Sequence, residues 1–73
     1  MATPILRVQV VVVGDAAIAD GFLDEMELAT GLRGERNAKG RVYEIEDRGM
    51  ASVSDRIVAH LSKGWQDHIA FEE

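Results

Sequence analysis

Acidic side chains gather on one short stretch of this chain, and basic side chains gather on the next. The acidic stretch falls inside a segment whose apolar spacing predicts a helix, so its carboxylates would line a helix flank away from the apolar face. A flank of this kind is ordinarily solvated. The sharper interpretation is a surface that docks on a basic partner, or one that imitates nucleic-acid phosphates. Its residues are Asp20, Asp24, Glu25 and Glu27.

The basic stretch follows in a glycine-rich segment without apolar periodicity, which predicts a loop over residues 31–40. Arginines in such a loop ordinarily pair with nearby acids, but they can also hold an acidic partner or a phosphate backbone. The net charge of −5 weighs against broad nucleic-acid binding. We keep this basic loop, residues 33–41, as the alternative binding site. Its residues are Arg33, Arg36, Lys39 and Arg41.

Aromatic residues are few, and two of them are candidates for the anchor of a binding surface. Exposed Tyr and Trp side chains often carry the energy of protein interfaces. Tyr43 follows the basic loop, and Trp65 follows the predicted end of a second helix, where covering the core is its other interpretation. We expect Tyr43 or Trp65 to anchor a partner beside the acidic flank.

No pattern in the sequence predicts catalysis. The chain has no cysteine, and its two histidines, His60 and His68, have no recognisable metal-ligand spacing. The Gly14-Asp15 pair after the first strand lacks the glycine fingerprint of a nucleotide site, and the carboxylate would repel a phosphate. The serines have no base arrangement beside them. We therefore predict no catalytic, cofactor-binding or metal-binding residues, and a protein that is not an enzyme.

The chain is organised around the aliphatic stretch from Ile5 to Val13. Most of its residues are branched at Cβ, which favours a strand. One face is wholly apolar and should be covered, whereas the other carries Arg7 and Gln9 and should be less well covered. The apolar face consists of Leu6, Val8, Val10 and Val12.

A first helix is expected from Asp15, as its N-cap, to about Thr30. Gly31 suits the left-handed residue after the last turn, with Leu32 folding back toward Met26 in a Schellman motif. The apolar side of this helix is predicted to comprise Ile18, Phe22, Met26 and Ala29, widened by Ala19 and Leu23.

Further elements follow from the second half of the chain. Residues 41–47 alternate as a strand, with Tyr43 and Ile45 on one face. Residues 52–63 carry an apolar stripe, with Ser52 opening a capping box and a glycine at 64 that ends the helix. Residues 65–71 fit a third strand, and a continued helix is the alternative.

The sequence therefore predicts one domain over residues 1–73, of the α+β or small α/β class. The order is β-α-β-α with a third C-terminal strand, and both helices pack on one face of a small sheet. No apolar run is long enough to span a bilayer, and the N-terminus lacks a signal-peptide pattern, so we expect a cytoplasmic protein. A homodimer should cover the second sheet face or extend the sheet.

For function, the leading expectation is a protein-binding module of the adaptor or inhibitor type that uses the acidic helix surface. One alternative is a nucleic-acid-associated regulator that uses the basic loop, and salt-sensitive binding to DNA or RNA would favour it. Another is a small structural subunit of a larger assembly, such as a phage particle. Stable purification as a monomer would weigh against that last alternative.

Overall fold

The computed structural model describes residues 4–46 and 53–72 of the chain. A strand, a helix and two further strands are followed by a second helix, a 3₁₀ turn and a last strand. The elements are β1 (Ile5–Val12), α1 (Ala16–Thr30), β2 (Glu35–Arg36), β3 (Gly40–Glu46), α2 (Val53–Val58), η1 (Trp65–Asp67) and β4 (Ile69–Glu72).

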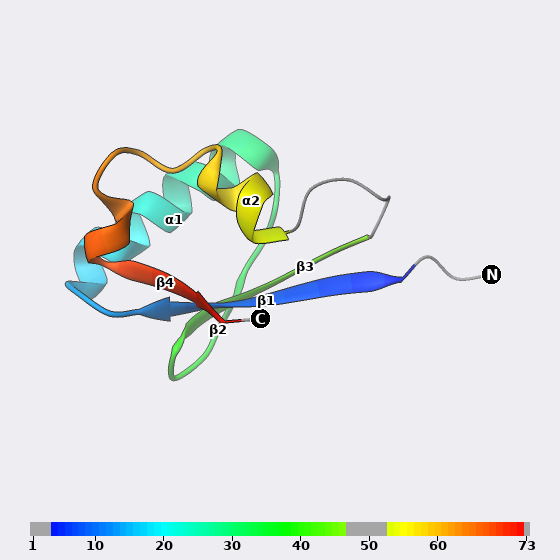
Figure 1. Ribbon diagram of the computed structural model, residues 1–73, viewed down its shortest axis with the longest axis horizontal. Coiled ribbons are helices and arrows are strands. Elements are labelled where there is room, and N and C mark those ends of the chain that lie inside the picture. Colours follow the sequence, from blue (N-terminus) through cyan, green and yellow to red (C-terminus); the bar gives the residue numbers. More distant parts are fainter. Residues whose placement is uncertain (1–3, 47–52, 73) are drawn as a thin grey trace.

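The strands of the described residues form one sheet in the order β2-β3-β1-β4, with every neighbouring pair antiparallel. Each helix connects two strands that have a third strand between them, which is the split β-α-β arrangement. Both helices lie on the same side of the sheet (Figure 1). The predicted α+β class and the packing of two helices on one sheet face are confirmed. This architecture carries many unrelated functions, so it assigns none by itself.

The core lies between β1 and the helices, as the alternation of the first strand predicts. Val8 and Val10 are buried, whereas Leu6 and Val12 are partly buried at either end of the same face. β1 lies between β3 and β4 in the sheet, so its side chains reach the centre of the domain. The helices contribute further buried side chains, among them Leu23, Met26 and Ile57.

The two ends of α1 are capped by the residues that the sequence indicates. The carboxylate of Asp15 accepts hydrogen bonds from the backbone N–H groups of Ala17 at 2.9 Å and Ile18 at 3.1 Å. Gly31 has a φ of 78°, and its N–H donates to the carbonyl of Glu27 at 2.8 Å. This single bond is the simpler αL motif, and the expected Schellman motif is wrong. The N–H of the next residue, Leu32, instead donates to the hydroxyl of Thr30 at 3.2 Å.

The buried side of α1 is rotated from the predicted one. Ala19, Leu23 and Met26 are buried, whereas Ile18 and Ala29 are exposed. The rotation brings one acidic edge of the helix toward the sheet, where an arginine of β3 lies. Apolar spacing alone could not show this, because the electrostatic partner comes from a distant part of the sequence.

The segment 31–40, predicted as a loop throughout, contains the two-residue strand β2. It pairs with β3 through Glu35↔Val42 and Arg36↔Arg41. The turn between them is closed by Asn37, whose side-chain oxygen accepts the N–H groups of residues 39 and 40 at 3.1 and 2.9 Å. Asparagine often has this role, because its side-chain oxygen can accept hydrogen bonds from nearby backbone N–H groups as a backbone carbonyl does in a turn.

The second helix is shorter than the predicted span of 52–63, because α2 ends at Val58. His60 and Leu61 then donate to the carbonyls three residues before them, at 3.0 and 3.1 Å, so the chain tightens and leaves the helix. The predicted third strand over 65–71 is partly right, since η1 covers its start and β4 begins only at Ile69. The capping box opened by Ser52 lies outside the described residues.

The outer face of the sheet is not covered by any described element. Ile5 and Val13 are each 57% exposed, and Val11, Val42 and Ala70 are half-buried. Arg7 pairs with Glu44 on this face, and Lys39, in the turn before β3, pairs with Glu72. Among the described residues, no helix is both long enough and apolar enough to cross a membrane.

Candidate functional site

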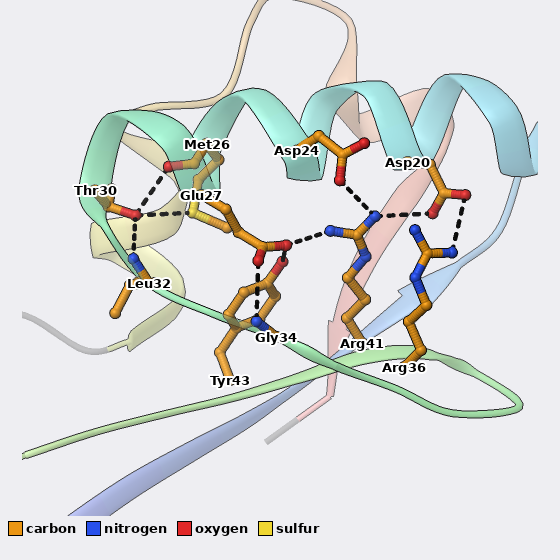
Figure 2. Close-up of polar contacts among 10 residues, drawn as sticks. All are labelled: Asp20, Asp24, Met26, Glu27, Thr30, Leu32, Gly34, Arg36, Arg41 and Tyr43. Carbon is orange, nitrogen blue, oxygen red and sulfur yellow. Dashed lines mark hydrogen bonds and ion pairs between the residues drawn. The ribbon is translucent and has the colours of Figure 1, made fainter.

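Three of the four predicted acidic residues turn toward β3 and meet a single arginine. Asp20, Asp24 and Glu27 lie four and three residues apart, so they share one edge of α1. The Nη2 atom of Arg41 lies 2.8 Å from a carboxylate oxygen of Asp24 and 3.3 Å from one of Asp20. Its Nη1 atom donates to Glu27. Figure 2 shows the guanidinium reaching from β3 to all three carboxylates.

Arg41 is a buried cation, since its side chain is only 5% exposed. Burial opposes the charge, but the hydrogen bonds to Asp24 and Glu27 outweigh it, so the pKa of Arg41 is raised above its ordinary value. Its Nε atom has no hydrogen-bond partner in the described part of the chain. An unpaired buried donor costs about 1–3 kcal/mol. The hydrogen bonds from the guanidinium to the three carboxylates offset this cost.

Glu27 is the residue through which α1, β3 and the intervening loop are joined. One carboxylate oxygen accepts the N–H of Gly34 at 3.2 Å, and the other accepts the hydroxyl of Tyr43 at 2.9 Å as well as Arg41. Burial raises the pKa of Tyr43, and the hydrogen bond to Glu27 and its negative charge raise it further. The phenol is therefore held as a neutral donor.

The loop at Gly34 must lack a side chain for this arrangement to form. A Cβ at Gly34 would lie 2.7 Å from the ring of Tyr43. The glycine thus lets the backbone pass over the phenol, close enough to donate to Glu27. The glycine-rich loop has a packing role here, which its composition alone did not indicate.

Tyr43 is fully buried, so it cannot be the exposed anchor that the sequence suggested. Its ring is part of the core, and the hydroxyl is used within the domain. Trp65 is half-buried and packs edge-on against Phe71, with ring centroids 5.4 Å apart. Of the two predicted anchors, Trp65 alone keeps some accessible surface, and it lies at the end of the domain formed by η1 and β4.

The four basic residues do not form one surface. Arg41 is buried, Arg36 pairs with Asp20 at 3.4 Å, and Lys39 pairs with Glu72 at 3.0 Å. Exposed pairs of this kind contribute little stability, but they reduce the positive field that the loop presents. Arg33 is exposed and lies apart from these pairs, beside the C-terminal end of α1.

The remaining predicted acid, Glu25, is exposed on another side of α1. Its carboxylate accepts a hydrogen bond from the hydroxyl of Ser62 at 3.5 Å. Asp24 also keeps an exposed side chain, at 62%, although one of its oxygens bonds Arg41. These two adjacent residues are the exposed part of the acidic flank, whereas Asp20 and Glu27 are half-buried.

An apolar residue that the sequence did not single out lies beside them. Leu28 is 88% exposed, which makes it the most exposed large apolar residue in the described part of the chain. It borders a shallow depression of about 540 Å³ at the C-terminal end of α1. The depression is lined by Asp24, Glu27, Leu28, Gly31, Leu32 and Arg33.

The two histidines make separate contacts within the described residues. His68 accepts the N–H of Asp15 through Nδ1 at 3.1 Å and stacks on Phe22, so its ring links β4 to the start of α1. His60 borders a small depression of about 190 Å³ with Thr30, Leu32 and Arg56. Within the described ranges, no group of three or more His, Asp or Glu side chains is placed to hold a metal ion.

No protein-family model, curated protein or solved structure matches this chain.

Proposed function

We propose that the protein is a protein-binding module of the adaptor or inhibitor type, and that its partner binds the outer surface of α1. This binding surface consists of Asp24, Glu25 and Leu28 together with the depression beside Leu28. The proposal keeps the acidic helix as the site. It replaces Tyr43 and Trp65 by Leu28 as the anchor.

The exposure of Leu28 carries the proposal. A single exposed apolar side chain is common on protein surfaces, but this one lies on a helix capped at both ends, beside a depression and two accessible carboxylates. Binding energy is usually concentrated in an apolar anchor on a rigid element, with charges around it that guide the encounter. The surface supplies both parts.

The charges of α1 indicate the chemistry of the partner. The helix carries four acids and no lysine or arginine, and the whole chain has a net charge of −5. Arg41 neutralises part of this charge from beneath, yet Asp24 and Glu25 remain accessible. The partner we propose therefore presents an apolar side chain to Leu28, flanked by lysines or arginines.

The proposal also includes a cytoplasmic setting and a homodimer. The dimer is supported by the uncovered outer face of the sheet, with Ile5 and Val13 exposed. The basic loop as a nucleic-acid site has less support, because three of its four cations have acidic partners within the domain.

Site-specific photo-crosslinking tests the proposal. A photoreactive phenylalanine analogue is placed at position 28, or at position 13 as a control that is exposed at the end of β1 instead. Both variants are expressed in the native host and irradiated, and crosslinked proteins are identified by mass spectrometry. A protein with a basic surface crosslinked at position 28 and not at position 13 is the expected result. Crosslinking of a different protein at position 13 alone would contradict the proposed site, whereas a crosslink there between two copies of this chain reports the homodimer.

A further inference from the structure

The charges of α1 oppose its own dipole. A helix is partially positive at its N-terminal end and partially negative at its C-terminal end, so acids favour the first turn and bases favour the last. α1 has no acid in its first turn and no base in its last, and three of its four acids lie in its C-terminal half. Departures from local preference of this kind are typical of functional sites. The C-terminal end of α1 therefore carries a negative potential that attracts a cation.

Arg41 compensates only part of this negative charge. Its guanidinium bonds Glu27 and one oxygen of Asp24 from the side of the sheet. Figure 2 shows the other oxygen of Asp24 pointing away from Arg41, and this side chain is largely exposed. One carboxylate oxygen near the end of the helix is thus open to a donor from outside the domain.

Backbone carbonyls add to the negative character of this helix end. The αL cap uses the carbonyl of Glu27, which accepts the N–H of Gly31. Among the described residues, no backbone N–H bonds to the carbonyls of the last three helical residues, Leu28, Ala29 and Thr30. The last carbonyls of a helix point beyond its end, which here is the side of the depression formed by the residues after α1. They are acceptors that water or a partner's donors must satisfy.

The depression beside Leu28 combines these acceptors with apolar walls. Its volume of about 540 Å³ lies in the range typical of ligand sites, roughly 300–1,000 Å³. Leu28 and Leu32 supply apolar surface, and Asp24 supplies a carboxylate. A long cationic side chain is divided in the same way, into an apolar stem and a charged head. Arg33 also lines the depression, so a cationic head is expected on the side of Asp24.

We propose that the depression binds an arginine side chain of the partner protein. The guanidinium donates to the open oxygen of Asp24 and to the open carbonyls of α1, and the stem packs against Leu28 and Leu32. Arginine suits these acceptors better than lysine, because its planar group presents five N–H donors in a fixed arrangement. This inference rests on the proposed function, since it names the residue with which the partner enters the binding surface on α1.

An NMR titration with an amino-acid derivative tests the depression without the partner. The probe is N-acetylarginine amide, and the control is N-acetylcitrulline amide, which has nearly the same shape without the charge. The arginine derivative should shift the amide signals of Gly31, Leu32 and Arg33 saturably at roughly millimolar concentration, because so small a ligand makes few contacts. The citrulline derivative should bind about fivefold less tightly, since it lacks charge-assisted hydrogen bonds. Equal binding of the two, or shifts confined to other parts of the chain, would overturn the proposal.

Two neighbouring acids separate a bound guanidinium from general attraction to an acidic helix. Asp24 lines the depression and Glu25 does not, although both are exposed. Asp24→Asn should weaken binding of the arginine derivative about threefold, whereas Glu25→Gln removes an equal charge and should change it by less than about twofold. The asparagine keeps an oxygen that can accept from Arg41. Equal losses in the two variants would overturn the site.

Arg33→Gln covers the case in which Asp24→Asn fails to fold. Arg33 is exposed and lines the same depression, so this variant should keep the fold while removing a charge that repels the probe. Binding of the arginine derivative should become about twofold tighter. Unchanged or weaker binding would overturn the proposal, because the depression would then not favour a cation.

Failure of this inference and failure of the proposed function give different results. A partner crosslinked at position 28, together with no binding of the arginine derivative, would overturn the arginine and leave the protein-binding function standing. Binding of the arginine derivative with no protein crosslinked at position 28 would contradict the protein-binding function and leave only the preference of the depression for arginine.

Discussion

The guanidinium of Arg41 and the carboxylate of Glu27 join β3 to α1 in the layer between sheet and helix (Figure 2). The same helix orientation buries Ala19, Leu23 and Met26 and turns the edge that carries Glu27 toward the sheet. Leu28, the next residue, is turned outward as a consequence. The internal ion pair and the exposed leucine are thus two results of one helix orientation.

Arg41→Met tests the contribution of this network to stability. The change leaves Asp20, Asp24 and Glu27 close together without their cation, so we expect a loss of about 2–3 kcal/mol. This is less than for a fully buried pair, since Asp20 and Asp24 are partly hydrated. Urea unfolding measures it. Arg36→Met, which removes an exposed partner of Asp20, should cost about 0.5 kcal/mol or less. Similar values for both variants would show that the network is screened by solvent.

Tyr43 gives the domain a dependence on alkaline pH. Its pKa is raised in the folded protein, whereas the unfolded chain ionises near the ordinary value of 10.0. The corresponding stability is therefore complete below pH 10 and is lost as the pH rises above it. Tyr43 is the chain's only tyrosine, so tyrosinate absorbance reports on it alone. A native titration at the ordinary value, matching that in urea, would contradict the buried donor.

Two glycines should respond in opposite directions to the same substitution. Gly34→Ala places a Cβ against the ring of Tyr43 and should destabilise the domain by about 1–3 kcal/mol. Gly21→Ala meets nothing within 4 Å and lies inside α1, so it should stabilise by about 0.5–1 kcal/mol. Thermal melts of both variants compare them directly. A stabilising Gly34→Ala would show that the loop does not pass over the phenol.

Val10 and Val11 compare the two faces of β1. Val10 is fully buried, so Val10→Ala should lower the free energy of unfolding by about 2 kcal/mol or more. Val11 on the outer face is half-buried, so Val11→Ala should lower it by less. Unfolding at low protein concentration keeps self-association out of the comparison. Equal losses would mean that the outer face is also covered.

Local chemistry made much of the fold predictable. The alternating valines of β1, the N-cap at Asp15 and the left-handed Gly31 depend on a few neighbouring residues, and the structure contains all three. The end of the second helix depends on strand pairing that involves residues far from it in the sequence. The chain must leave α2 early enough for Ile69 to pair with Val12, which no local signal at the helix end expresses.

The candidate site was less predictable, because its residues come together only in the tertiary structure. One signal was available for Arg41: it is two residues before Tyr43 on the same strand, so alternation places both on the buried face. Leu28 also had a signal. Leu28 is two residues after Met26, which places it about 200° around the helix, on the side opposite the buried Met26. The pairing of Arg41 with Glu27 had no such signal.

Binding of the crosslinked partner to variants of α1 tests the proposed function most directly. Leu28→Ala should weaken binding by roughly 2 kcal/mol, mainly through faster dissociation, whereas Ile18→Ala on the same helix should change little. The double variant Asp24→Asn/Glu25→Gln should slow association at low salt and have less effect at physiological salt. Glu27 is left intact, because it holds Arg41. If Leu28→Ala binds as the wild type does and the double variant Arg36→Ala/Lys39→Ala abolishes binding, the partner uses the basic loop, and the account of α1 is wrong.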